Sequence, residues 1–115
     1  MSVTIYHNPR CSKSRETLAM LEGRGFKPRV IEYLLNPPDT KTLTAIVKKL
    51  GGPARKLLRT KEAAYLENGL DNEKLTDAQI IAAIVNNPIL MERPIVLAND
   101  KAAIGRPPEN VLEIL

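Results

Sequence analysis

Cys11 is the only cysteine in the 115-residue sequence, and its position favours a reactive thiol. A predicted strand over residues 3–6 precedes it, and a predicted helix begins near Ser12. A thiol between them faces the unpaired backbone N–H groups of the first helical turn and the positive end of the helix dipole, both of which stabilise a thiolate. We therefore predict a pKa below the ordinary value and a nucleophilic sulfur near neutral pH. Nearby residues that can add positive charge are His7, Arg10, Lys13 and Arg15.

The alternative interpretation of a lone cysteine is a buried, unreactive side chain that acts as a small hydrophobic residue. The neighbours Asn8 and Pro9 are turn-forming rather than core residues, which favours the reactive thiol. Ser14 lies one helical turn after Cys11, where its hydroxyl can donate a hydrogen bond to the sulfur but cannot form a disulfide. Low-molecular-weight phosphatases place an arginine six residues after their cysteine. That position is Thr17 here, so their phosphate-binding loop is absent.

The counts of cysteine and histidine exclude two kinds of site. One cysteine cannot form an intramolecular disulfide, and one cysteine with one histidine, His7, cannot supply the four ligands of a structural zinc site. Any redox chemistry at Cys11 must therefore take its second thiol from another molecule. We expect no bound metal and no bound cofactor.

Apolar periodicity and proline-containing turns predict the element order β-α-β, a helical middle, then β-β-α. The length supports one domain over residues 1–115. We expect an α/β fold with a small mixed sheet of four strands, a parallel first pair, a hairpin turning at residues 99–100, and helices on its faces. The predicted strands are residues 3–6, 29–34, 94–97 and 101–105. The predicted helices are residues 12–24, 39–50 capped by Asp39, 53–59, one opened by a capping box of Thr76 and Gln79, and 107–115.

Charge and composition restrict the partners. Seventeen Lys and Arg against thirteen Asp and Glu give a net charge of +4, which favours anionic ligands. One Phe, three Tyr and no Trp are too few for a base-stacking surface, so we expect no nucleic-acid partner. No apolar run approaches the ~20 residues that cross a bilayer, and the first residues do not resemble a signal peptide. We therefore expect a cytoplasmic protein with no membrane partner.

Motifs in four parts of the chain, in order and with matching separations, resemble the glutaredoxin-coupled arsenate reductase (ArsC) family. The resemblance extends from residue 3 to residue 115. It points to the short, chromosomally encoded type of member, because the better-known arsenate reductases continue into a longer C-terminal tail. The motifs are Tyr6-His7-Asn8-Pro9-x-Cys11-x-x-Ser14-Arg15, then Leu57-Leu58-Arg59, then Pro88-Ile89-Leu90 leading to Arg93-Pro94-Ile95-Val96, and finally Gly105-Arg106-Pro107.

The resemblance implies a thioredoxin-like fold with a helical insertion between the β-α-β and β-β-α halves, which agrees with the predicted element order. It implies that Cys11 attacks arsenate, that glutathione is the co-substrate, and that glutaredoxin resolves the mixed disulfide. His7 and Ser14 would help to hold the thiolate. For His7, a neutral imidazole that packs at the end of the strand is the alternative interpretation. Because thioredoxin-like folds place a cis-proline opposite the cysteine, we predict a cis peptide bond before Pro94. The residues implied to line the oxyanion site are Arg59, Arg93 and Arg106.

Each of these arginines also has an ordinary interpretation when it is taken singly. Arg59 ends a predicted helix and can complement its dipole, Arg93 can pair with Glu92, and Arg106 can be a solvated residue before a proline. Arg15, on the predicted first helix, can likewise be a solvated charge that happens to match the motif. Together with Cys11 and in family order, the three arginines favour an oxyanion site.

Two other functions remain open. The first is a glutathione-dependent thiol oxidoreductase of the same fold that acts on another substrate, since arsenate can be a secondary substrate of the short members. The second is an Spx-like regulator that binds RNA polymerase without turnover. Such regulators generally carry C-x-x-C, whereas Ser14 stands at the second position here and the three arginines would have no role. We expect a monomeric enzyme.

Overall fold

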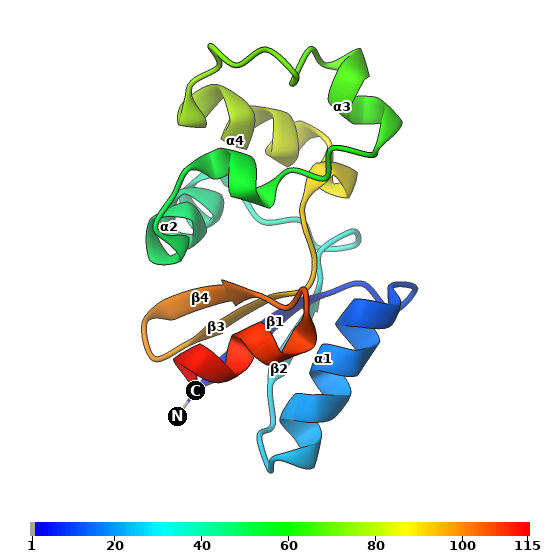
Figure 1. Cartoon of the computed structure of the whole chain (residues 1–115), viewed down its shortest axis with the longest axis vertical. Helices are drawn as coiled ribbons and strands as arrows, with labels where there is room; N and C mark the ends of the chain where they lie inside the picture. The colour runs from blue at the N-terminus through cyan, green and yellow to red at the C-terminus, as the bar shows by residue number, and fades with distance from the viewer. Residues whose placement is uncertain (1) are drawn as a thin grey trace. The chain divides into compact units, whose positions relative to one another are not determined.

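The computed structural model describes residues 2–115, which form two compact units (Figure 1). The sheet unit comprises the chain up to Asn36 together with Arg93–Leu115. The helical unit comprises Pro37–Glu92, which is inserted in the sequence between the two halves of the sheet unit. This is the predicted thioredoxin-like α/β arrangement with a helical insertion. That residues 1–115 behave as one domain stays a prediction.

The sheet unit contains one four-stranded mixed sheet in the order β2-β1-β3-β4. As predicted, β1 is parallel to β2, and β3 and β4 form an antiparallel hairpin; β1 and β3 are also antiparallel. The hairpin turns at Asn99 and Asp100, which have φ values of 52° and 65°. Two consecutive left-handed residues are what a two-residue hairpin turn requires, and Asn and Asp tolerate this conformation. The strands are β1 (Val3–His7), β2 (Arg29–Glu32), β3 (Ile95–Ala98) and β4 (Lys101–Ile104).

The strand β2 is shorter than predicted, because the chain turns away after Glu32. The carbonyl of Glu32 accepts hydrogen bonds from the backbone N–H groups of Leu35 and Asn36, at 3.0 and 2.9 Å. These bonds close a turn over residues 33–35, where the sequence predicted continued strand. The turn leaves Leu34 and Leu35 with exposed side chains.

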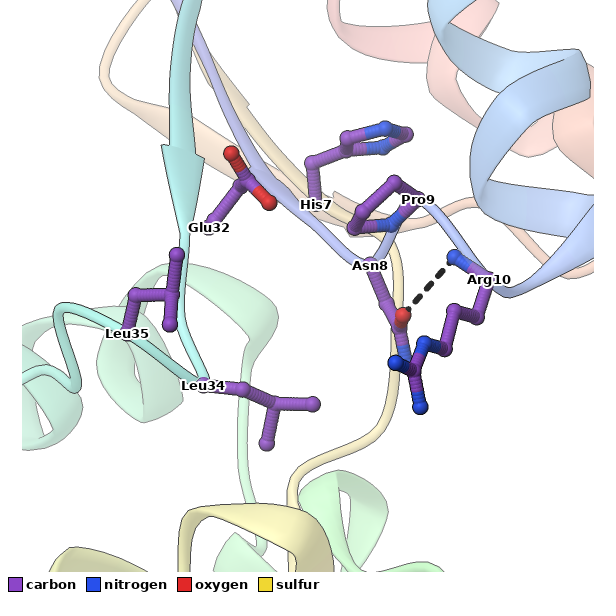
Figure 2. Close-up of a pocket in the computed structure, with 7 residues that line it drawn as sticks. All are labelled: His7, Asn8, Pro9, Arg10, Glu32, Leu34 and Leu35. Carbon is purple, nitrogen blue, oxygen red and sulfur yellow. Dashed lines mark hydrogen bonds between the residues drawn. The ribbon is translucent and has the colours of Figure 1, made fainter.

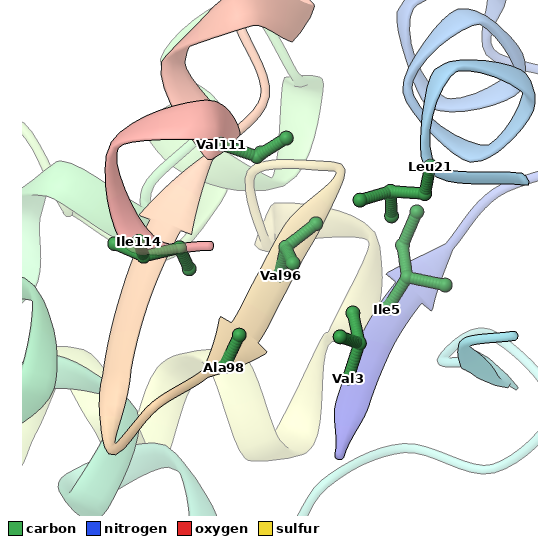
Figure 3. Close-up of a cluster of buried hydrophobic side chains, with 7 residues drawn as sticks. All are labelled: Val3, Ile5, Leu21, Val96, Ala98, Val111 and Ile114. Atoms are coloured by element: carbon green, nitrogen blue, oxygen red, sulfur yellow. The ribbon is translucent and has the colours of Figure 1, made fainter. Parts of the chain in front are cut away.

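Two helices, α1 (Ser12–Gly23) and the 3₁₀ helix η3 (Pro108–Ile114), cover one face of the sheet (Figure 3). Alternate residues of a strand point to opposite faces, so Val3 and Ile5 of β1 share the covered face. Burial of this apolar cluster fixes α1 against β1 and thereby fixes the chain that joins them. The cluster consists of Val3, Ile5, Leu21, Val96, Ala98, Val111 and Ile114.

The helical unit confirms the predicted caps. The Asp39 side chain accepts a hydrogen bond from the backbone N–H of Thr42 at 2.8 Å and starts α2. Thr76 and Gln79 form the complete capping box that starts α4. The sequence did not predict α3 and η2, which are short; α3 has no side-chain cap and no buried residue. The elements are α2 (Thr40–Leu50), η1 (Ala54–Leu57), α3 (Ala63–Glu67), α4 (Asp77–Asn86) and η2 (Pro88–Leu90).

Apolar stripes of α2 and α4 form much of the core of the helical unit. The two helices contact each other, and α4 also contacts η1 and η2. Each stripe lies on one face of its helix, with its residues three or four positions apart as the helical repeat requires. No helix within residues 2–115 is both long and apolar enough to cross a membrane. The buried residues of the two stripes are Leu43, Ile46, Val47, Ile80, Ile81 and Ile84.

Candidate active site

Cys11 is the N-cap residue of α1, as the sequence predicted. Its backbone is extended, with φ −94° and ψ 123°. Its own N–H donates to the carbonyl of Asn8 at 3.0 Å, and its carbonyl accepts from the N–H of Arg15 at 3.0 Å, which starts the helical hydrogen bonds. The side chain is buried, with 9% of its surface exposed. The sulfur therefore lies against the first turn of α1 with little access to solvent.

The pKa of the Cys11 thiol is lowered, although burial by itself would raise it. The backbone N–H of Ser14 and the positive charge of Arg93 oppose the effect of burial, and the backbone N–H of Lys13 and the charge of Arg106 add to them. The first helical turn thus contributes to a lowered pKa, as predicted. The positive charges that lower the pKa come from residues far along the chain.

Arg106 makes a direct contact with the cysteine. Its Nη1 lies 3.8 Å from Cys11 Sγ, at a hydrogen-bonding distance for sulfur. Arg93 acts on the same thiol through its charge and directly precedes Pro94, and the peptide bond between these two residues is cis, as predicted. The structure therefore places the Arg106 guanidinium against Cys11, and the charge of Arg93 acts on the same thiol. That both arginines bind an oxyanion stays a prediction.

Gly105, the residue before Arg106, lies in a tightly packed position. A Cβ added to Gly105 would lie 2.7 Å from Oγ1 of Thr17 and 2.8 Å from Cγ of Pro94, closer than side chains pack. The Gly105 N–H also donates to the Pro94 carbonyl at 2.9 Å. Only glycine fits between α1 and Pro94. This close approach fixes the backbone position from which the Arg106 side chain extends. The sequence showed Gly105 in a motif but gave no reason for it.

Ser14 has partners that differ from the predicted one. Its Oγ lies 2.6 Å from Nδ1 of His7 and accepts a hydrogen bond from the backbone N–H of Asn8 at 3.0 Å. Within residues 2–115, this hydroxyl forms no hydrogen bond to the sulfur of Cys11. The sequence was wrong on this point because the end of β1 packs beside α1 and supplies two nearer partners. Ser14 acts on the sulfur through its backbone N–H.

His7 is uncharged near neutral pH, which favours the alternative of a neutral imidazole at the end of β1 over an added positive charge. Burial lowers its pKa, the carboxylate of Glu32 on the neighbouring strand partly offsets this, and the charge of Arg15 lowers it further. A neutral imidazole stabilises no anion by charge. Its place in the site is instead the hydrogen bond with Ser14, which ties the end of β1 to the first turn of α1.

Arg15 forms a hydrogen bond to the loop that leads into Cys11. Its Nη1 donates to the carbonyl of Pro9 at 2.9 Å. The Asn8 side chain adds a second bond within the loop, since its Oδ1 accepts from the backbone N–H of Arg10 at 3.0 Å. From the sequence alone, Arg15 can be a solvated charge. The structure gives it a specific contact with the loop that leads into Cys11.

Arg59 belongs to the helical unit. Its backbone N–H donates to the carbonyl of Leu90 at 2.8 Å, next to an isolated antiparallel bridge between Leu58 and Met91. Its Nη2 forms an ion pair with Oε1 of Glu62 at 2.6 Å. These bonds hold Arg59 within its own unit. Its predicted place in the oxyanion site stays a prediction.

A pocket of about 370 Å³ lies beside the cysteine loop, entirely within the sheet unit (Figure 2). One side is formed by the loop after β1, and the other by the end of β2 and the turn that follows it. Within residues 2–115, no group of three or more His, Cys, Asp and Glu side chains is placed to hold a metal ion. The pocket is lined by His7, Asn8, Pro9, Arg10, Glu32, Leu34 and Leu35.

The fold and the site define a thioredoxin-like protein with one cysteine whose pKa is lowered by a helix start and by arginines. The ArsC family model matches residues 6–114, and the chain belongs to this family. It is 53% identical over 116 residues to an arsenate reductase of Haemophilus influenzae, covering all of both chains. It is 56% identical over 114 residues to the uncharacterized protein YfgD of Escherichia coli K12, covering 98% of this chain and 96% of YfgD. The structure of an arsenate reductase from Vibrio cholerae matches with a TM-score of 0.96 and 51% identity, covering 100% of this chain and 98% of that one.

Proposed function

We propose that this protein is an arsenate reductase in which Cys11 is the nucleophile. The observation that carries the proposal is the contact between Arg106 and Cys11, 3.8 Å from Nη1 to Sγ, at a thiol whose pKa is lowered. A thiolate beside a guanidinium combines a nucleophile with a binding group for anions. Relatives named arsenate reductase, such as that of Haemophilus influenzae, supply the identity of the anion.

The arginines reduce the electrostatic repulsion between the thiolate and an anionic substrate. Arsenate carries a charge between −1 and −2 near neutral pH, so an anionic sulfur repels it. Guanidinium groups stay charged and can present paired donors to two oxygens of a tetrahedral oxyanion. Arg93 and Arg106 offset the repulsion at Cys11, and Arg59 supplies a third guanidinium by the family pattern. We assign all three to substrate binding.

The reaction begins when the Cys11 thiolate forms a bond to arsenic. One arsenate oxygen is protonated and leaves as water, and arsenic stays in the +5 state. The thiolate of glutathione then attacks the Cys11 sulfur. A disulfide forms, the sulfur–arsenic bond breaks with its electron pair on arsenic, and arsenite leaves in the +3 state.

Glutaredoxin then attacks the glutathione sulfur of the mixed disulfide and restores Cys11. Overall, two thiols lose two electrons, arsenic gains two, and one molecule of water is formed. The electrons come from thiols, so the route uses no bound cofactor. A single cysteine in the chain suits this route, since each further thiol is supplied by a partner.

His7 and Ser14 act as positioning residues in this scheme. Their hydrogen bond of 2.6 Å ties the end of β1 to the first turn of α1. The backbone N–H groups of Lys13 and Ser14 belong to this first turn and lower the pKa of the sulfur. The hydrogen bond from the Arg15 side chain to the Pro9 carbonyl holds the loop that precedes Cys11.

The direct test is arsenite formation in the presence of glutathione and glutaredoxin. Wild type should form arsenite, and Cys11→Ser should not, because a hydroxyl of far higher pKa supplies almost no nucleophilic anion. Circular dichroism of Cys11→Ser checks that the fold is retained. A wild-type protein that alkylates readily at Cys11 but forms no arsenite would instead be a thiol oxidoreductase for another substrate.

A further inference from the structure

The pocket beside the cysteine loop carries one cationic and one anionic side chain on opposite walls, with apolar side chains alongside (Figure 2). Arg10 extends from the loop after β1, and Glu32 projects from the end of β2. We propose that this pocket binds the reducing thiol as a short peptide that has both a free ammonium and a free carboxylate group. The inference rests on the proposed function, because that function requires an external thiol.

The need for an external thiol follows from the chain itself. Cys11 is the only cysteine, so the electrons that reduce a bound oxyanion and the thiol that releases Cys11 both come from another molecule. That thiol must reach the Cys11 sulfur while the arginines Arg93 and Arg106 are occupied by the oxyanion. A separate binding pocket next to the same loop meets this requirement.

The pocket is close enough to Cys11 for such a peptide. Pro9 and Arg10 line it and directly precede Cys11 in the chain, and consecutive Cα atoms are about 3.8 Å apart. An extended tripeptide spans about 10 Å, which is longer than the single Cα step between the lining residue Arg10 and Cys11. The volume of about 370 Å³ lies in the usual range for small-molecule sites.

The charges of the pocket are available to a ligand. Among residues 2–115, neither the Arg10 guanidinium nor the Glu32 carboxylate forms an ion pair. Both side chains are exposed, so a ligand can pair with them without breaking an existing bond. A carboxylate would pair with Arg10 and an ammonium with Glu32. The exposed Leu34 and Leu35, at 46% and 73%, supply apolar contact for the peptide between these ends.

Thiol–disulfide exchange with oxidised glutathione tests the pocket without arsenate. The Cys11 thiolate attacks one sulfur of the disulfide, a mixed disulfide forms, and one glutathione thiolate leaves. The rate constant is compared among wild type, Arg10→Gln and Glu32→Gln. Two further disulfides serve as probes: dithiodiglycolate, which is anionic and has no ammonium, and hydroxyethyl disulfide, which is neutral. The matched controls for charge are Arg24→Gln and Glu22→Gln, exposed residues near the far end of α1.

Glu32→Gln is the most informative variant, because the two possible roles of Glu32 predict opposite changes in the rate constant of exchange with oxidised glutathione. If Glu32 acts only through the overall electrostatic field of the protein, removing its negative charge speeds exchange with anionic oxidised glutathione. If Glu32 holds the ammonium, the rate falls. We expect a decrease of about two- to fivefold for each pocket variant with oxidised glutathione, since exposed ion pairs contribute modestly. Dithiodiglycolate should be slowed by Arg10→Gln alone, and hydroxyethyl disulfide by neither variant.

An unchanged or higher rate of Glu32→Gln with oxidised glutathione would overturn the proposal, as would an equal slowing with all three disulfides. The controls Arg24→Gln and Glu22→Gln should match wild type to within the small effect of net charge. Arsenite formation is measured separately. The expected exchange pattern without arsenite formation would keep the pocket and reject arsenate as the substrate.

Discussion

The guanidinium of Arg106 lies 3.8 Å from the sulfur of Cys11, although the two residues are 95 positions apart in the sequence. Gly105 makes this contact possible, because a larger residue would collide with Thr17 and Pro94. The nucleophile and its cation therefore depend on two segments from opposite ends of the chain, brought together by the packing of the sheet unit.

The pKa of Cys11 should rise when either arginine loses its charge. Arg93→Gln and Arg106→Gln each remove a positive charge that lowers this pKa, and Arg93 is the larger of the two contributions. Iodoacetamide alkylation followed across pH measures the value, with Arg24→Gln as an exposed control. An inflection of wild type at or above about 8.5, the unperturbed value, would contradict an activated thiol.

The Cys11 thiolate should make folding stability depend on pH. Because its pKa is lower in the folded than in the unfolded state, the thiolate contributes stability that is fully present above about pH 8.5 and is lost as the pH falls through the folded pKa. The free energy of unfolding of wild type minus that of Cys11→Ser, measured by urea titration from pH 5 to 9, should rise with pH and then level off. The titration of His7 is common to both proteins and cancels. A flat difference would show that the pKa is the same in both states.

Gly105→Ala should destabilise the protein by about 1–3 kcal/mol, the usual cost of overpacking. The new methyl group would lie 2.7 Å from Thr17 Oγ1 and 2.8 Å from Pro94 Cγ. Thr17→Ala in the same chain should recover part of the loss, because it removes one of the two collisions. Gly23→Ala is the matched control: it lies in α1 with nothing within 4 Å of the added atom, and a gain of about 0.5–1 kcal/mol is expected. Equal effects at the two glycines would contradict the packing argument.

Ser14→Ala should lower stability yet leave Cys11 activated. The change removes the partner of His7 Nδ1 and of the Asn8 N–H, at a cost of about 1–3 kcal/mol for buried groups left unpaired. The Ser14 backbone N–H, which lowers the Cys11 pKa, is retained. The alkylation pKa should therefore stay below about 8.5. A rise to the unperturbed value would show that the Ser14 hydroxyl stabilises the thiolate directly.

Arg59→Ala should lower kcat/KM for arsenate by roughly ten- to a hundredfold, the effect of losing a charge-assisted contact of about 1.5–3 kcal/mol. The alkylation rate of Cys11 with neutral iodoacetamide should not change, because Arg59 is not among the groups that lower the Cys11 pKa. Glu62→Gln separates the two roles of Arg59, since it removes only the ion pair of 2.6 Å. An unchanged kcat/KM for Arg59→Ala would assign Arg59 to the structure of the helical unit alone.

The sequence by itself determined the features that depend on neighbouring residues. The position of Cys11 at the start of α1, the Asp39 cap and the Thr76 capping box all follow from spacings of a few residues, because helix ends are set by local backbone hydrogen bonds. The apolar stripes of α2 and α4 follow from the helical repeat in the same way. The cis bond before Pro94 and the set of three arginines were predicted only through the family resemblance.

Tertiary structure alone decided which groups meet at the sulfur. The Ser14 hydroxyl turned to His7 and Asn8 because β1 packs beside α1, and no spacing in the sequence distinguishes that partner from the sulfur one turn away. Burial lowers the pKa of His7, and the cations that lower the pKa of Cys11 are Arg93 and Arg106 rather than its sequence neighbours. Local patterns fix the backbone near each residue, whereas the pKa of a buried group depends on its desolvation and on charges that only the folded chain brings within reach.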